Sequence, residues 1–210
     1  MLCYLAPIKP GIWGKSVKKL NFAAAAAVLV ATATPLAAQQ LTTKGYDFVN
    51  AVEKRDGDKV NQLLNDNPPG IVNTRASDGD TPLIIVISRE DADWTGFLLK
   101  KGADVNLAGK GGDTPLITAS RVGFEDAVEW LIALGAKVDA PNRSGETPLI
   151  VAVQQRQPQI VKVLLEAGAN PDKSDSVAGY SARDYAARDN RGRQLLQLIE
   201  AKKPKAPSAH

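Results

Sequence analysis

Thr81-Pro82-Leu83, Thr114-Pro115-Leu116 and Thr147-Pro148-Leu149 recur at intervals of 33 residues, and a glycine lies two residues before each threonine. A threonine at a helix start can accept a bond from a backbone N–H, and a proline at the first helical position loses no hydrogen bond. Leucine-rich runs follow at the same interval, and each leads to a glycine of the kind that ends a helix in a left-handed conformation. Each unit is therefore predicted to hold two short helices, near 82–90 and 92–101 in the first clear copy.

These residues closely resemble the ankyrin family, whose repeat contains Gly-x-Thr-Pro-Leu-His-x-Ala, a second helix ending in Leu-Leu and then Gly-Ala-Asp-Val-Asn. The last motif stands unaltered at Gly102-Ala103-Asp104-Val105-Asn106. The resemblance implies an all-α ankyrin-repeat solenoid of about five helix-turn-helix repeats with short hairpin loops. Because one unit cannot bury its own apolar face, at least three must stack, and the degenerate outer two are expected to be caps. The expected repeats lie at about 44–76, 77–109, 110–142, 143–176 and 177–202.

One departure from the family pattern is systematic. The histidine that follows Thr-Pro-Leu in the family is Ile84, Ile117 and Ile150 in this chain. In the family this histidine ties the turn together by hydrogen bonds. Isoleucine gives up those bonds and adds apolar burial between repeats, about 1.5–3 kcal/mol for a fully buried side chain. The pattern therefore predicts the same fold with hairpin loops that are held more loosely.

The N-terminal segment has the pattern of a secretory signal peptide. Lys18 and Lys19 precede the uncharged run Leu20–Val30, and small residues continue to Ala38. An alternative is an uncleaved membrane anchor, since this uncharged stretch is nearly long enough to span a bilayer. We expect the chain to divide into a signal peptide at 1–38, a linker at 39–43, the repeat domain at 44–202 and a disordered tail at 203–210.

Charge and residue types argue against several classes of function. The whole chain carries a net charge of +3, but residues 1–38 contain four lysines and no acidic residue, so the remainder is slightly acidic. That remainder has no basic footprint for a nucleic acid. Its only histidine is the last residue, His210, and Cys3 lies in the predicted signal peptide. Nucleophilic catalysis commonly needs such a base or thiol, so we expect no enzyme activity, cofactor, metal or small-molecule substrate.

The resemblance also implies where a protein partner binds. Ankyrin proteins use a concave face made of hairpin tips and first helices. In this chain an acidic line of Asp80, Asp113 and Glu146 would lie along the tips, with arginines behind it. We interpret these positions as free of structural duty, the alternative being ordinary solvated charge. The predicted partner-binding residues are Ser77, Asp78, Asp80, Ser88, Arg89, Lys110, Asp113, Arg121, Val122, Arg143, Glu146, Gln154, Gln155, Tyr180, Arg188 and Asp189.

Two tryptophans, Trp94 and Trp130, could either pack in the core or form a binding platform on the surface. Trp130 falls in register with Phe97 and Val163 in an apolar row, so core packing is favoured over a binding platform, and the same holds less strongly for Trp94.

Together these patterns predict an exported, monomeric protein-binding scaffold, placed in the periplasm of a Gram-negative bacterium. The alternatives are a membrane-tethered organiser and a secreted effector that binds host proteins.

Overall fold

The computed structural model describes residues 34–67 and 69–201, with side chains described from residue 43 onward except at 69. The chain divides into two compact units, residues 1–40 and 41–210, and the description below concerns the second unit except where α2 begins. Most of the predicted signal peptide and the whole predicted tail at 203–210 lie outside the described residues. Among the described helices, none is long and apolar enough to cross a membrane.

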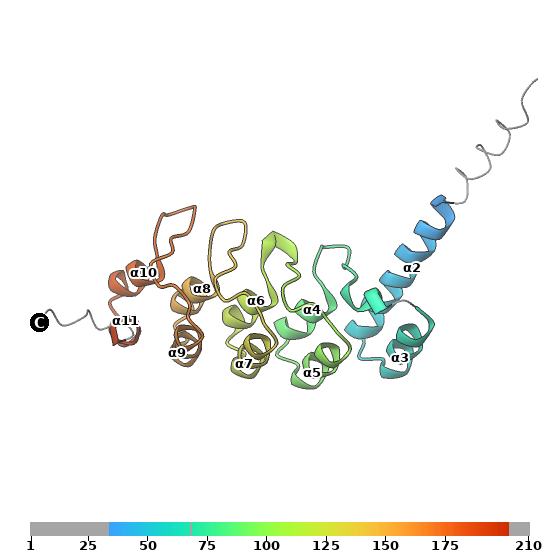
Figure 1. Ribbon diagram of the computed structural model, residues 1–210, viewed down its shortest axis with the longest axis horizontal. Coiled ribbons are helices and arrows are strands. Elements are labelled where there is room, and N and C mark those ends of the chain that lie inside the picture. Colours follow the sequence, from blue (N-terminus) through green and yellow to red (C-terminus); the bar gives the residue numbers. More distant parts are fainter. Residues whose placement is uncertain (1–33, 68, 202–210) are drawn as a thin grey trace, which may run out of the picture. The chain divides into compact units, whose positions relative to one another are not determined.

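The described residues form ten α-helices in five helix-turn-helix pairs, as predicted. Figure 1 shows the pairs side by side in one row, with the hairpin loops along one edge. From the second pair onward, first helices contact first helices of neighbouring pairs, and second helices contact second helices. Two short 3-10 turns, Pro69–Asn73 and Lys110–Gly112, lie between pairs. The pairs are α2 (Thr34–Glu53) with α3 (Gly57–Asp66), α4 (Pro82–Ser88) with α5 (Ala92–Lys100), α6 (Pro115–Val122) with α7 (Glu125–Ala133), α8 (Pro148–Gln154) with α9 (Pro158–Glu166), and α10 (Ala182–Arg188) with α11 (Arg193–Ala201).

The start of α2 differs from the expected domain boundaries. Residues 39–43, expected to be a linker, are helical, because α2 runs without interruption from Thr34 to Glu53. The stretch from Leu36 to Lys44 contains neither glycine nor proline and includes alanine, leucine and glutamine, which favour a helix. Cleavage after Ala38 would therefore remove the first residues of this helix.

The repeated Thr-Pro-Leu motif starts the first helices as predicted. The hydroxyls of Thr81, Thr114 and Thr147 each accept a hydrogen bond from the backbone N–H three residues later, at 3.2–3.3 Å. In the last repeat Ser181 takes this place and forms a reciprocal capping box with Asp184. The glycines at 102, 135 and 168 have φ values of 86°, 87° and 91°, so they end the second helices in the predicted left-handed conformation.

The isoleucines that replace the family histidine are part of the core. Ile84 is 3% exposed, and Ile117 and Ile150 are fully buried. They lie on the first helices α4 (Pro82–Ser88), α6 (Pro115–Val122) and α8 (Pro148–Gln154), which contact one another between repeats. The predicted apolar burial between repeats is therefore confirmed.

A ladder of side chains also ties the first four repeats together at the loops that follow the second helices. Asn73 Oδ1 accepts a hydrogen bond from Asp104 N at 2.8 Å, and Asn106 Oδ1 accepts one from Lys137 N at 2.8 Å. The third rung is Asp139, whose Oδ1 accepts from the next repeat at 3.0 Å. The final residue of the Gly-Ala-Asp-Val-Asn motif thus positions the neighbouring repeat, which keeps the hairpins in register.

One buried polar atom in α5 is unsatisfied and leads to a stability prediction. Thr95 is fully buried, and among the described residues its Oγ1 has no hydrogen-bond partner. Valine stands at the corresponding positions 128 and 161. We expect Thr95→Val to raise the free energy of unfolding by about 1 kcal/mol, because it removes the desolvation penalty of the hydroxyl.

Urea unfolding followed by circular dichroism measures this change. Thr118→Val is the matched control, since Thr118 is also buried but its hydroxyl donates to Thr114 O at 3.2 Å. The control should show no gain in stability. Equal stabilisation by both substitutions would contradict the explanation.

Candidate protein-binding face

We use the name concave face for the surface formed by the hairpin loops and the first helices α4, α6, α8 and α10. The predicted binding residues all lie on this surface or at the ends of these helices. Their contacts show which of them are engaged within the protein and which remain available to a partner.

Asp80, just before α4, ties the hairpin before α6 to the preceding repeat. Its Oδ1 accepts a hydrogen bond from Lys110 N at 2.7 Å. A Cβ placed on the adjacent Gly109 would lie 2.3 Å from Asp80 Oδ1 and 2.8 Å from Ile84 Cδ1. The Asp80 carboxylate therefore fills the space that a side chain at 109 would need, and only glycine permits this approach.

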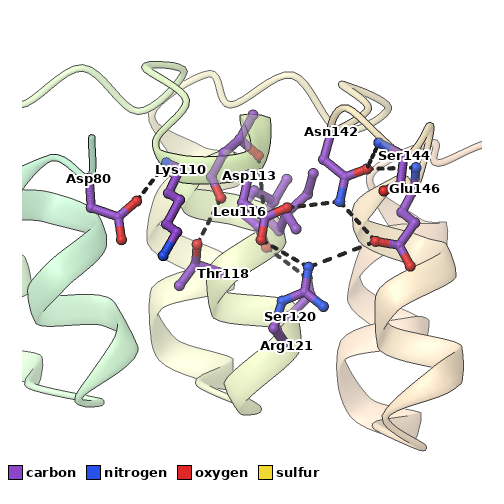
Figure 2. Close-up of polar contacts among 12 residues, drawn as sticks. Asp80, Lys110, Asp113, Leu116, Thr118, Ser120, Arg121, Asn142, Ser144 and Glu146 are labelled. Carbon is purple, nitrogen blue, oxygen red and sulfur yellow. Dashed lines mark hydrogen bonds and ion pairs between the residues drawn. The ribbon is translucent and has the colours of Figure 1, made fainter. Parts of the chain in front are cut away.

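Asn142 holds the following hairpin with its own side chain (Figure 2). Its Oδ1 accepts hydrogen bonds from Ser144 N at 3.0 Å and Glu146 N at 2.9 Å. Its Nδ2 donates to Asp113 Oδ1 and to Glu146 Oε2, both at 2.8 Å. All four hydrogen-bonding positions of the amide are thus occupied. This one side chain joins the start of α6 to the start of α8.

Arg121, at the end of α6, completes the network. Its Nη2 lies 2.9 Å from Asp113 Oδ2 and 3.9 Å from Glu146 Oε2. The side chains of Arg121, Asp113 and Glu146 are 37%, 25% and 22% exposed, so the group is solvent-facing but not fully solvated. The result is a preformed polar surface that crosses repeats three and four.

The expectation that Asp80, Asp113 and Glu146 have no structural role is wrong. Asp80 and Asp113 each accept a hydrogen bond from the next hairpin, and Glu146 accepts one from Asn142 within its own hairpin. The hairpins that lack the family histidine are thus tied by other side chains, instead of being left loose as predicted. Carboxylates can do this because they accept several hydrogen bonds at once.

The remaining predicted residues at the helix ends also contact the protein itself. Arg89 Nη1 donates to Glu53 O at 3.0 Å, which links α4 to α2. Arg188 places its guanidinium carbon 3.8 Å from the centre of the Tyr180 ring. Asp189 accepts a hydrogen bond from Arg156 Nε at 2.6 Å, which joins the last two repeats.

Other predicted binding residues make only local bonds or are exposed, so they are more available to a partner. Ser88 Oγ donates to Ile85 O at 2.8 Å, and Asp78 Oδ1 accepts from Asp80 N at 3.1 Å, both local bonds. Four further side chains are exposed and two are half-buried. The exposed ones are Ser77, Lys110, Arg143 and Gln155, and the half-buried ones are Val122 and Gln154.

A hollow lies on this face between α4 and α6, with a volume of about 340 Å³. Ile84 and Val122 contribute apolar surface to it, and Asp80, Asp113 and Arg121 line its polar side. Six of the predicted binding residues, together with Ile84, thus line one hollow, which is large enough for a side chain of the partner.

A comparison with protein families agrees with this architecture. A profile described as ankyrin repeats in three copies matches residues 48–142 and 97–175. The chain belongs to the ankyrin-repeat family. Ankyrin repeats are protein-binding scaffolds and are typically not catalytic. The match ends at 175, and the α10–α11 pair continues the ankyrin stack beyond it. A search of curated proteins found no match.

The last hairpin is organised by Asp175, the residue 33 positions after Asn142. Asp175 is 6% exposed, and its Oδ1 accepts bonds from the backbone N–H groups of residues 177–179 at 2.6–3.1 Å. Its Oδ2 accepts from Tyr185 Oη at 2.7 Å. Burial alone would raise the pKa of this carboxyl, but the hydrogen bonds from Tyr185 and the three amides outweigh it and hold the pKa below its usual value.

This arrangement predicts how the last repeat responds to acid. Because the pKa of Asp175 is lower when folded, its contribution to stability is present above the unfolded pKa of about 3.9 and is lost as the pH falls through the folded value. We expect the amides of residues 177–179 to exchange hydrogen faster, relative to intrinsic rates, as the pH falls below about 3.9 and through the lower folded pKa of Asp175. Asp175→Asn is the control and should remove this pH dependence. An unchanged profile in the variant would show that another group is responsible.

Asn142 and Asp175 were missed by the sequence analysis. The signal was present, since both stand at the same point of the 33-residue period, a few residues before the glycine of the next Thr-Pro-Leu motif. Asparagine and aspartate at such turns commonly bond nearby backbone amides. The first two hairpins obscured the pattern, because they carry Ala76 and Gly109 at this position.

The tryptophans pack against the core, as predicted. Trp94 and Trp130 are half-buried and meet Phe97 and Phe124 edge to face, with ring centres 5.5 Å and 6.1 Å apart. Trp130 also lines a groove on the surface formed by the second helices.

Within residues 34–67 and 69–201, no group of three or more His, Cys, Asp or Glu is placed to hold a metal ion.

Proposed function

We propose that this ankyrin-repeat protein acts outside the cytoplasm and captures a protein partner on its concave face, across repeats two to four. The observation that carries the binding surface is the network centred on Asn142, which fixes Asp113, Arg121 and Glu146 relative to one another. A surface that is already ordered loses little conformational freedom when a partner binds.

The surface offers two kinds of contact to such a partner. The hollow between α4 and α6 accepts a side chain against Ile84 and Val122. Around it, Lys110, Arg143 and Gln155 are exposed and can pair with polar groups of the partner. A few buried contacts inside a polar rim are the usual basis of affinity in protein interfaces.

Site-specific photo-crosslinking in the native cells tests the binding face. A crosslinking amino acid at Lys110 or Gln155 should capture the same partner. The same amino acid at Lys162 or Glu166, exposed positions on α9, is the matched control and should capture none of it. Capture from the α9 positions alone would place the binding surface elsewhere and overturn the proposal.

Export rests on the N-terminal sequence, with its lysines, apolar run and small residues up to Ala38. We propose the periplasm of a Gram-negative bacterium as the site of action. Mass spectrometry of protein from fractionated cells should find a mature chain that begins at Gln39 in the periplasmic fraction. A chain that keeps residues 20–38 and stays in the membrane pellet would support the membrane-tethered organiser. A mature chain in the culture medium would support a secreted effector.

A further inference from the structure

The surface formed by the second helices contains an apolar groove between α5 and α7, with a volume of about 690 Å³. Phe97 and Trp130 form its walls, and Ala133 and Leu134 border it. Leu134 is 56% exposed, an unusual degree for a large apolar side chain that has no role in the core. This groove lies on the second helices, away from the first helices that carry the proposed binding face.

The repeats themselves show that this groove departs from their own surface pattern. Gly96 corresponds to Glu129 and Lys162 in the next two repeats. Leu134 corresponds to Lys101 in the preceding repeat. Ala133 corresponds to Lys100 and Glu166. At Gly96, Ala133 and Leu134 the charged residues of other repeats are thus absent and apolar surface is exposed, while Asp93 and Lys100 line the same groove. Concentrated apolar surface of this kind marks an interaction site.

The charges along α5 indicate what covers the groove. Asp93, Gly96 and Lys100 are spaced by three and four residues, so they share one face of the helix. Asp93 lies in the first turn, Lys100 in the last, and Gly96 at the midpoint of Ala92–Lys100. Within the described part of the chain neither charged group has an ion-pair partner, and both side chains are exposed.

This face is complementary to itself when two copies of α5 run antiparallel. A two-fold axis at Gly96 would bring Asp93 of each copy to Lys100 of the other. A Cβ at Gly96 would meet no atom within 4 Å, so the groove is open at the crossing point and a second helix can approach closely. Antiparallel helices also set their dipoles in the favourable arrangement. Neither α7 nor α9 repeats this order of acid, glycine and base.

We propose that the groove between α5 and α7 is the contact of a symmetric dimer, in which a second copy of this chain packs against it through its own α5. This differs from the monomer expected from the sequence. Helices of nine residues are about 14 Å long, so the contact is smaller than a standard interface of about 800 Å² per partner. The dimer is therefore expected to be transient.

Sedimentation equilibrium of the full chain between about 10 µM and 1 mM tests the dimer, since a transient dimer assembles at micromolar to millimolar concentrations. The weight-average mass should rise toward twice that of the monomer. Leu134→Lys and Gly96→Lys should keep the monomer mass throughout, and both introduce residues that another repeat carries at the same position. Lys162→Ala, on α9, is the control and should dimerise as the unaltered chain does. A constant monomer mass of the unaltered chain would overturn the proposal.

A charge exchange tests the antiparallel pairing itself. Asp93→Lys and Lys100→Asp should each be monomeric alone, because each brings like charges together. An equal mixture of the two should form dimers again, since each variant then supplies the charge that the other lacks. Failure of the mixture to dimerise, with both variants folded by circular dichroism, would overturn the pairing. Crosslinking of a partner from Lys110 should be unaffected by Leu134→Lys, so the dimer and the concave face can fail independently.

Discussion

Ile150→Ala should lower the free energy of unfolding by about 2–5 kcal/mol, the range for removing a large buried aliphatic side chain. Ile150 is fully buried, and 0% of its surface is accessible to solvent. It lies on α8, which contacts both α6 and α10. The cavity left by the substitution would therefore loosen the packing of the fourth repeat against its neighbours.

Urea unfolding monitored by circular dichroism measures this loss. Ile150→Val should cost about 0.5–1.5 kcal/mol, because a single methylene is removed. Val177→Ala is the surface control, since Val177 is 80% exposed, and it should change stability by less than about 0.5 kcal/mol. A cost below 1 kcal/mol for Ile150→Ala would mean that the isoleucine does not replace the family histidine by apolar packing, as we infer.

Asn142→Ala should lower the free energy of unfolding by about 2–3 kcal/mol. The substitution removes four hydrogen bonds, two of them to carboxylates, and it leaves Asp113 and Glu146 near each other without the amide between them. Because the site is half-buried, water can replace only part of these bonds. The effect should reach the binding face, since the same amide positions the residues around Arg121.

Arg143→Ala is the matched control for this experiment. Arg143 is the next residue along the hairpin and its side chain is exposed, so its loss should change stability by less than about 0.5 kcal/mol. Asn142→Ala should also reduce partner capture from a crosslinker at Gln155. Normal capture by a destabilised Asn142→Ala variant would separate the hairpin network from partner binding.

The hydrogen-bond network around Asn142 also changes what charge reversal on the concave face should do to stability. From the sequence, Asp80→Lys with Glu146→Lys would be expected to abolish binding without affecting the melting temperature. In the structure the Asp80 carboxylate accepts a hydrogen bond from the backbone N–H of Lys110, and the Glu146 carboxylate accepts one from the side-chain amide of Asn142. Reversing these charges must therefore also destabilise the hairpins, so Lys110 and Gln155 are the better positions from which to examine binding.

The period, the helix starts and the buried faces of the repeats followed from the sequence alone. Thr81 before Pro82 is a local signal, because the cap bond closes within four residues. Ile117 and Leu131 could be assigned to the core because the 33-residue step repeats their surroundings in each unit. Such features depend on neighbours along the chain, so the order of residues is sufficient to predict them.

The roles of Asp80, Asn142 and Arg121 depended on the folded arrangement. Their bonds join residues that are eight to thirty positions apart and belong to different hairpins or to opposite ends of a helix. Whether a carboxylate on a repeat surface is free or engaged is set by how closely the adjacent hairpin approaches, as at Gly109. The groove beside Leu134 exists for the same kind of reason: Gly96 of one repeat and Leu134 of the next stand where other repeats carry charges, and only the stacking of the two repeats brings these positions together.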